Sequence, residues 1–186
     1  MNMKYRYCIW LFVLALCAPY GRARGDDYAS NTVYIKSGPY GGYYAKAIPD
    51  EHYGSKGVTK IYVVGKEEDK LIETYPWYSQ DIDLEHTLWG MSVVRIGTCR
   101  MAQEVSRDDL AIGLYLAGKT LREYSTLDVA LAVDDSGARS RYCRYPKILG
   151  YRSIGSNEYV LDVETGGKTL SFDTKTGELL GDQKTK

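Results

Sequence analysis

The chain has few of the residues on which common catalytic motifs depend. It contains only two histidines, His52 and His86. Neither belongs to an HExxH zinc motif, and the sequence has no GxSxG nucleophile elbow. The glycine-rich segment 37–44 lacks the Lys-Ser/Thr ending of a phosphate loop. We therefore interpret both histidines as surface or turn residues, and no cofactor is expected.

The chain also lacks an excess of positive charge. Its 24 basic side chains equal its 24 acidic ones. Residues 1–25 hold four of the basic side chains and none of the acidic ones, so the rest of the chain carries 20 basic against 24 acidic. A mildly acidic chain without a basic block lacks the electrostatic signature of a nucleic-acid binder. Nucleic acid is not expected as a partner.

Long apolar runs are absent except at the N-terminus. There, Lys4 and Arg6 precede an uncharged apolar run from Cys8 to Ala18. This run is shorter than the roughly 20 residues that a membrane-spanning helix needs. A basic start followed by a short apolar segment predicts a secretory signal peptide over residues 1–25. An uncleaved N-terminal anchor is the alternative.

Small residues at the end of this segment indicate where it is cut. Gly21 and Ala23 have the small-x-small spacing of a signal-peptidase site, so cleavage is expected after Ala23, with Gly25 as the alternative. The remainder, residues 26–186, is long enough for one domain with its own core. We expect this domain to be exported to the periplasm, the cell envelope or the medium, with no membrane span after cleavage.

Cysteine is scarce, with four residues in the chain. Cys8 and Cys17 fall within the signal segment, and Leu16 disfavours lipidation of Cys17 because lipoprotein processing needs a small residue there. Cys99 and Cys143 remain, and two cysteines in an oxidising compartment favour a disulfide. Closing their loop would stabilise the fold by up to roughly 4 kcal/mol. A catalytic or metal-binding thiol is the less favoured alternative.

The region after the signal segment favours β-strands. It is rich in Tyr, Gly, Thr and Val, which suits pleated sheets joined by turns. No stretch of 12 or more residues has a helical apolar stripe. Period-two runs cover residues 32–36, 42–48, 59–65, 70–75, 91–99, 110–116 and 120–125. We predict a mainly β fold, an antiparallel meander, sandwich or small open barrel of hairpins, with one or two short helices over 102–109 and 127–133.

The clearest local signal is a hairpin over residues 158–173. Its two-residue turn is Gly166-Gly167, which tolerates the positive φ values of the primed turns. The expected register pairs Leu161 with Phe172 and Val163 with Leu170 on one face, and polar residues on the other.

A weak repeat suggests that such hairpins recur. Segments 61–66, 114–119 and 170–177 each place an apolar strand before a Gly or Lys turn, and a second apolar segment follows. These units resemble the outer hairpins of β-propeller blades, although their intervals are irregular and the chain is short for a propeller with blades of about 40 residues.

Two further segments carry a resemblance to a family. Residues 106–128 contain Tyr115-Leu-Ala-Gly-Lys-Thr-Leu-Arg-Glu-Tyr-Ser-Thr-Leu-Asp128, and residues 172–178 read Phe-Asp-Thr-Lys-Thr-Gly-Glu. Together they resemble uncharacterised bacterial exported β-rich proteins. The resemblance covers about a quarter of the chain and implies an exported β-protein, without an activity.

Two clusters are candidates for binding. Asp81, Asp83 and Glu85 would share one face of an extended strand, where three carboxylates are weak candidates for Ca²⁺; the alternative is a solvated face opposite the core. The densest aromatic cluster comprises Tyr75, Trp77, Tyr78 and Trp89. Exposed, these rings would suit a sugar or a protein partner; buried, they are ordinary core.

These observations favour a non-catalytic binding or scaffolding domain over an enzyme. A glycan or another envelope protein is the expected partner. The alternative function is a secreted carbohydrate-acting hydrolase with paired carboxylates such as Asp83, Asp108 or Asp109. The adjacent acids Asp108 and Asp109 are otherwise interpreted as a cap, and Asp134-Asp135 as a tight turn.

Overall fold

The computed structural model describes residues 30–97, 104–133, 145–155 and 158–182. The predicted signal peptide, Cys99 and Cys143 lie outside these residues, and so does the turn predicted at Asp134-Asp135. In the described part of the chain, no helix is long and apolar enough to span a membrane.

The described residues form a mainly β fold, as predicted, with three four-stranded antiparallel sheets. Each sheet is a meander in which consecutive strands are neighbours. Sheet 1 contains β1 (Tyr34–Ser37), β2 (Tyr43–Pro49), β3 (Gly57–Val63) and β4 (Lys70–Tyr75). Sheet 2 contains β5 (Ile82–Thr87), β6 (Gly90–Ile96), β7 (Leu110–Leu116) and β8 (Lys119–Ser125). Sheet 3 contains β9 (Lys147–Ser153), β10 (Tyr159–Thr165), β11 (Lys168–Asp173) and β12 (Leu179–Asp182).

Two short helical elements complete the described fold. The 3-10 turn η1 (Pro39–Gly41) joins β1 to β2, and α2 (Thr126–Val133) follows β8. The helix predicted over 127–133 is therefore confirmed. The one predicted over 102–109 is wrong for residues 104–109, which contain no helix. Ser106 instead bonds through its backbone to Thr126 and Leu127 at the start of α2, which is incompatible with a helical hydrogen-bond ladder.

The predicted hairpin is β10–β11. Leu161 pairs with Phe172 and Val163 with Leu170, as the alternation predicted. Gly166 and Gly167 have φ values of 63° and 80°, which side chains on both residues would disfavour. The local sequence therefore sets the register of this hairpin.

The weak repeat corresponds to the same place in each sheet. Its three segments are the third strand and the following turn of sheets 1, 2 and 3, namely β3, β7 and β11. The apolar segments that follow are the fourth strands, β4, β8 and β12. The resemblance to outer hairpins of propeller blades thus reflects three sheets that share the same four-stranded meander topology.

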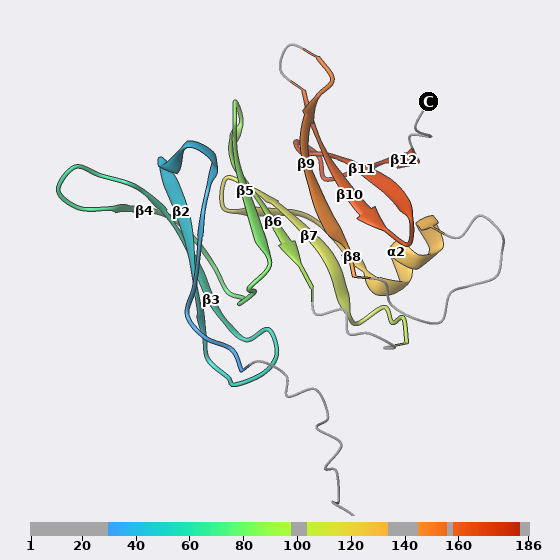
Figure 1. Ribbon diagram of the computed structural model, residues 1–186, viewed down its shortest axis with the longest axis horizontal. Helices are drawn as coiled ribbons and strands as arrows, with labels where there is room; N and C mark the ends of the chain where they lie inside the picture. Colours follow the sequence, from blue (N-terminus) through green and yellow to red (C-terminus); the bar gives the residue numbers. More distant parts are fainter. Residues whose placement is uncertain (1–29, 98–103, 134–144, 156–157, 183–186) are drawn as a thin grey trace, which may run out of the picture.

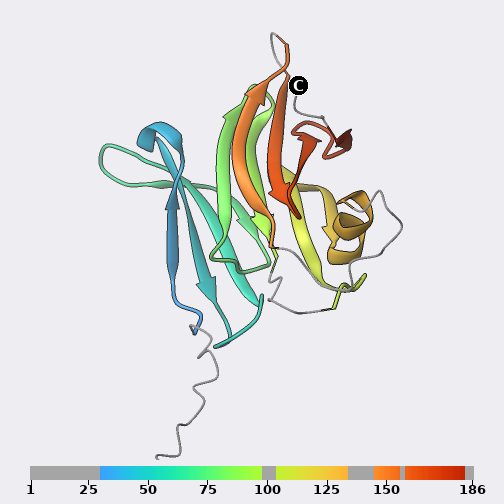
Figure 2. The same ribbon diagram turned by 45° about the vertical axis from the view of Figure 1, so that its right-hand side comes forward.

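The three sheets stack face to face in chain order, with sheet 2 in the middle (Figures 1 and 2). Sheets 1 and 2 enclose a first cluster of buried side chains, core 1, which includes Ile61, Leu84 and Tyr115. Sheets 2 and 3 enclose core 2, which includes Leu114 and Phe172. Since both faces of sheet 2 are covered, every side chain of β6 from Met91 to Ile96 is buried.

The sheets diverge from their first strands toward their last. Near the first strands core 1 contains Ala45 and Ala47, and both β1 and β2 contact β5 directly. Toward the last strands the space is filled by the stacked rings of Tyr75 and Trp77 and by the Tyr115 ring, which is tilted against both. Between sheets 2 and 3 the helix α2 packs against β7, β8 and β11. The sheets therefore form a fan that is narrow at β1, β5 and β9.

Candidate functional site

Three of the four candidate aromatic residues lie in core 1. Tyr75, Trp77 and Tyr78 are only 3%, 6% and 2% exposed, which corresponds to the core alternative left open by the sequence. The Tyr78 hydroxyl donates to the Thr32 carbonyl oxygen at 2.7 Å. Only Trp89 presents its ring at the surface, at 49% exposure. The structure thus separates Trp89 from the other three.

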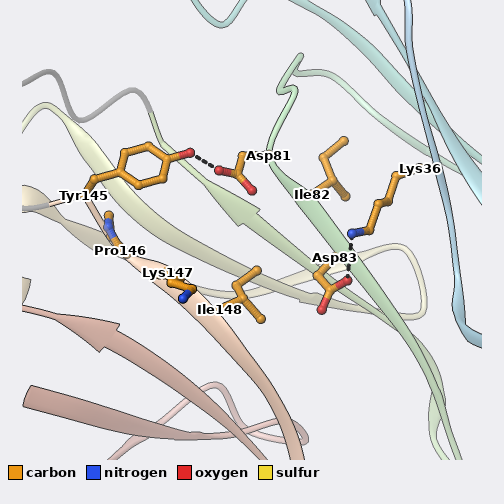
Figure 3. A pocket seen from close by; sticks show the side chains of 8 residues that line it. All are labelled: Lys36, Asp81, Ile82, Asp83, Tyr145, Pro146, Lys147 and Ile148. Carbon is orange, nitrogen blue, oxygen red and sulfur yellow. Dashed lines mark hydrogen bonds and ion pairs between the residues drawn. The ribbon is translucent and has the colours of Figure 1, made fainter.

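A polar hollow lies where the first strands of the three sheets meet. We call it the junction groove; its volume is about 220 Å³ (Figure 3). β1 contributes one residue, the start of β5 contributes three, and β9 and the residues before it contribute four. They are Lys36, Asp81, Ile82, Asp83, Tyr145, Pro146, Lys147 and Ile148. The groove therefore exists only because the sheets pack together.

The face of β5 toward the groove carries the carboxylates predicted from alternation. Ile82 and Leu84 are buried, whereas Asp81, Asp83 and Glu85 lie on the opposite, partly exposed side. Figure 3 shows that Asp81 and Asp83 have different partners.

Both groove carboxylates are already engaged. The Asp83 Oδ1 atom lies 3.6 Å from the Lys36 ammonium. The Asp81 carboxylate accepts a hydrogen bond from the Tyr145 hydroxyl. Each carboxylate is thus held by a residue from a different sheet or its flanking segment, which fixes the groove lining in place.

Partial burial makes this edge electrostatically unusual. Desolvation raises the pKa of the Asp81 carboxyl; the Lys36 ammonium opposes this, while Asp83 adds to it. Desolvation and the Asp83 charge also raise the pKa of Glu85. Beneath them, burial raises the pKa of the Tyr151 hydroxyl well above its usual value, and the Asp83 carboxylate adds to this. Carboxyl and hydroxyl groups along β5 are therefore stabilised in their protonated form, or when a positive charge lies beside them.

The structure shows how the three carboxylates along β5 are arranged. Among the described residues, no group of three or more His, Cys, Asp or Glu side chains is arranged to hold a metal ion. At Asp83 the nearby positive charge is the Lys36 ammonium. The Ca²⁺ interpretation of Asp81, Asp83 and Glu85 therefore gains no support from their geometry.

The other acidic and histidine candidates lie away from the groove. Asp108 and Asp109 precede β7, where the Asp109 carbonyl accepts from the Thr126 amide. His52 and His86 are exposed, and the His86 amide donates to the Tyr43 hydroxyl. Of the catalytic candidates, only Asp83 lines the groove, beside the calcium candidate Asp81.

Sequence reasoning missed three of the five polar groove residues. Lys36, Tyr145 and Lys147 carry no motif, and they come from β1 and from the segment that enters β9. Only the alternation in β5 pointed to this place. The contribution of the other strands depends on how the sheets pack, which local patterns do not encode.

A second hollow surrounds Trp89 in the turn between β5 and β6. This Trp89 pocket, of about 290 Å³, lies against the β9–β10 and β11–β12 connections. Its other lining residues are Ile154, Glu158, Tyr159, Asp173, Thr174, Lys175 and Thr176. The Lys175 ammonium lies 4.1 Å from the centre of the Trp89 ring. One face of this exposed indole is thus occupied by a cation from the chain itself.

Comparisons of this chain with protein-family models, with curated proteins and with solved structures find no match. The junction groove and the Trp89 pocket are therefore the starting points for an inference of function.

Proposed function

We propose that this protein is a non-catalytic binding domain whose junction groove holds a neutral, polyhydroxylated ligand, that is, a glycan. The observation that carries the proposal is the convergence of Lys36, Asp81, Asp83, Tyr145 and Lys147 on one hollow. Two ammonium groups and two carboxylates give no net charge, which favours a neutral ligand over an ion. Their fixed donors and acceptors match the hydroxyl groups of a sugar.

The Tyr145 side chain supports the same ligand class. It is 53% exposed, and its hydroxyl is tied to Asp81, so one end of the ring is fixed while a face stays accessible. A flat ring beside hydrogen-bonding groups suits the apolar face of a sugar. The existing pairs favour binding over catalysis, because Asp83 is ion-paired with Lys36 and Asp81 is hydrogen-bonded to Tyr145.

A glycan array probed with the labelled protein tests this proposal. We expect hits among neutral oligosaccharides and a loss of at least tenfold in affinity for the best hit on Tyr145→Ala or Asp83→Asn, measured by calorimetry. Asp108→Asn, outside the groove, is the matched control and should leave affinity unchanged. An array without hits, or hits that Tyr145→Ala does not weaken, would contradict a glycan site in the groove.

We also propose that the domain works after export. The support is the basic and apolar pattern of residues 1–25 together with Cys99 and Cys143 as a candidate disulfide. The intact mass of protein from the producing cell should correspond to a chain that begins after Ala23 or Gly25. A mass that includes Met1 in exported material would contradict cleavage, and two freely labelled thiols would contradict the disulfide.

One observation favours the second candidate function, a carbohydrate-acting hydrolase. Asp81, with its raised pKa, lies two residues from the ion-paired Asp83 on one side of β5. Such a spacing along a strand is about 7 Å, within the range of about 6.5–9.5 Å found for the two carboxyl groups of inverting glycosidases. Release of reducing sugar from the array hits, abolished by both Asp81→Asn and Asp83→Asn, would establish catalysis in place of binding alone.

A further inference from the structure

In the described part of the chain, the outward faces of sheets 1 and 3 border no core cluster, although Val160 and Ser171 on sheet 3 are themselves buried. Sheet 2 is covered by core 1 and core 2, whereas sheets 1 and 3 each face only one core. We propose that these two faces bind each other between two copies of the chain. In this pair, the outward face of sheet 1 in each copy packs against the outward face of sheet 3 in the other.

The outward face of sheet 1, called face 1, is unusually apolar for a solvated sheet. Ile35 is 57% exposed and Leu71 is 46% exposed. The Tyr44 and Tyr62 rings stack at 5.1 Å between centroids. The outward residues of the four strands are Ile35, Ser37, Tyr44, Lys46, Ile48, Val58, Lys60, Tyr62, Leu71 and Thr74. Apolar residues thus lie on both sides of the row formed by Lys46, Lys60 and Thr74, and exposed apolar groups gathered on one face are typical of an interaction surface.

The charges on face 1 indicate what covers it. Lys46 and Lys60 are direct cross-strand partners, and the outward strand residues include no acid, although Asp69 in the β3–β4 turn accepts a hydrogen bond from Tyr44 at the end of this face. Like charges opposite one another destabilise a sheet. Packing face 1 against its own copy would bring four lysines together. The occupant must instead supply acidic groups.

The outward face of sheet 3, called face 3, supplies them. Its outward strand residues include three acids and two bases. Glu164 is exposed, and it lies between Lys147 and Thr169 in the sheet. Asp162 accepts from Arg152 at 2.9 Å and from Ser171 at 2.6 Å. Face 3 is therefore polar and acidic in balance, complementary to the lysines of face 1.

The fan-like arrangement of the sheets allows such a contact to close. Sheets 1, 2 and 3 follow one another side by side (Figure 2), and residues of β1, β5 and β9 line one hollow, so the sheets are arranged like successive blades of a propeller. Closed rings of four-stranded sheets contain about four to eight of them. Two chains would supply six sheets. The contact between face 1 and face 3 would then occur twice, related by a two-fold axis, and no sheet face would stay open.

Light scattering coupled to size-exclusion chromatography tests the pair. We expect the purified protein to have the mass of two chains over a broad range of concentration. Leu71→Asp on face 1 and Glu164→Lys on face 3 should each raise the dimer dissociation constant at least tenfold. Leu131→Asp is the matched control, because Leu131 is similarly exposed, at 47%, but lies on α2.

A charge exchange makes the test specific for the pairing of the two faces. Lys60→Glu alone should weaken the dimer, and Lys60→Glu combined with Glu164→Lys should restore it, because the two charges are exchanged between the complementary faces. A monomer at all concentrations would overturn the proposal. So would a dimer that Leu71→Asp disrupts and Glu164→Lys leaves intact, or a mass that keeps rising with concentration.

Discussion

Core 1 and core 2 flank the same sheet but contain different side chains. Core 1 buries four tyrosines and Trp77 beside its aliphatic residues. The fully buried part of core 2 is aliphatic except for Phe172. The difference follows from the fan, since large rings fill the wide side of core 1, whereas α2 fills the wide side of core 2.

Their chemistry differs accordingly, because each buried tyrosine hydroxyl needs a hydrogen-bond partner. The Tyr75 hydroxyl donates to Glu73 at 2.6 Å, and the Tyr115 hydroxyl donates to Glu123. The Arg95 guanidinium lies 4.9 Å from the centre of the Trp77 ring. Core 1 is therefore coupled to charged groups at its rim, whereas the fully buried side chains of core 2 are all apolar. The two cores should respond differently to mutation and to pH.

The largest effect is expected in core 2. Phe172 is 1% exposed, and its ring packs against Tyr124 at 5.2 Å. Phe172→Ala should lower the free energy of unfolding by about 3–5 kcal/mol, because it removes buried area and leaves a cavity. Urea denaturation should give the same loss at about pH 5 and pH 8, since no charged group is involved. A loss that varies with pH would contradict a purely apolar core 2; Val64→Ala, at an exposed position, is the control.

A smaller, pH-dependent effect is expected in core 1. Burial raises the pKa of Glu73, and the hydrogen bond from Tyr75 opposes this rise. Tyr75→Phe removes that donor and should cost about 1–3 kcal/mol at neutral pH. The cost should shrink in acid, because protonated Glu73 no longer needs the donor. Tyr53→Phe, at an exposed tyrosine, is the control, and an equal loss at both pH values would show that core 1 is not coupled to Glu73.

Two carboxyl substitutions should reveal opposite dependences on pH. The folded state raises the pKa of Glu73, so ionisation of this group reduces stability as pH rises through its ordinary value of about 4.3 and up to the raised one. Glu73→Gln should therefore stabilise the protein at neutral pH, and the gain should vanish in acid.

Asp162 on sheet 3 behaves in the opposite way. The Arg152 guanidinium and the Ser171 hydroxyl lower its pKa, so its contribution is present above about pH 3.9 and is lost as pH falls through the lowered value. Asp162→Asn should destabilise at neutral pH and not at low pH. Equal slopes for both variants in a series of urea titrations from about pH 3 to pH 7 would contradict this comparison.

The smallest effect is expected on face 3. Arg152→Lys keeps the charge but removes the two-pronged bond to Asp162, which Arg152 makes through Nε and Nη2 at 2.9 and 3.1 Å. The shift in the urea midpoint should be smaller than for any variant above and should decrease further in high salt. A shift as large as that of Tyr75→Phe would mean that this ion pair matters more than its exposure implies.

Local signals predicted a large part of this fold. The β10–β11 register followed from two glycines and a period-two pattern, both of which lie within one short segment. Three strands were not among the predicted runs, β5, β9 and β12. The acidic alternation in β5 predicts an extended segment but not its pairing. β12 has only four residues. β9 contains Gly150, at a φ of 132°, beside a shift in its register with β10. A break in the alternation removes the pattern on which the prediction depends.

The site was less predictable than the fold. Asp81 and Asp83 could be found because they alternate with Ile82 and Leu84 on one strand. Lys36 and Tyr145 reach them only through packing between sheets. The same limit applies to Trp77, whose burial depends on sheet 2 covering sheet 1. Alternation separates the two faces of a strand, but it does not tell which face a neighbouring sheet will cover.

The double covering of sheet 2 has a consequence for how the molecule opens. The amide protons of β6, between Met91 and Ile96, are held in the ladders with β5 and β7, and sheets 1 and 3 cover both faces of this strand. Their hydrogen exchange should therefore follow global unfolding, whereas the short edge strand β12 of sheet 3 should exchange by local opening.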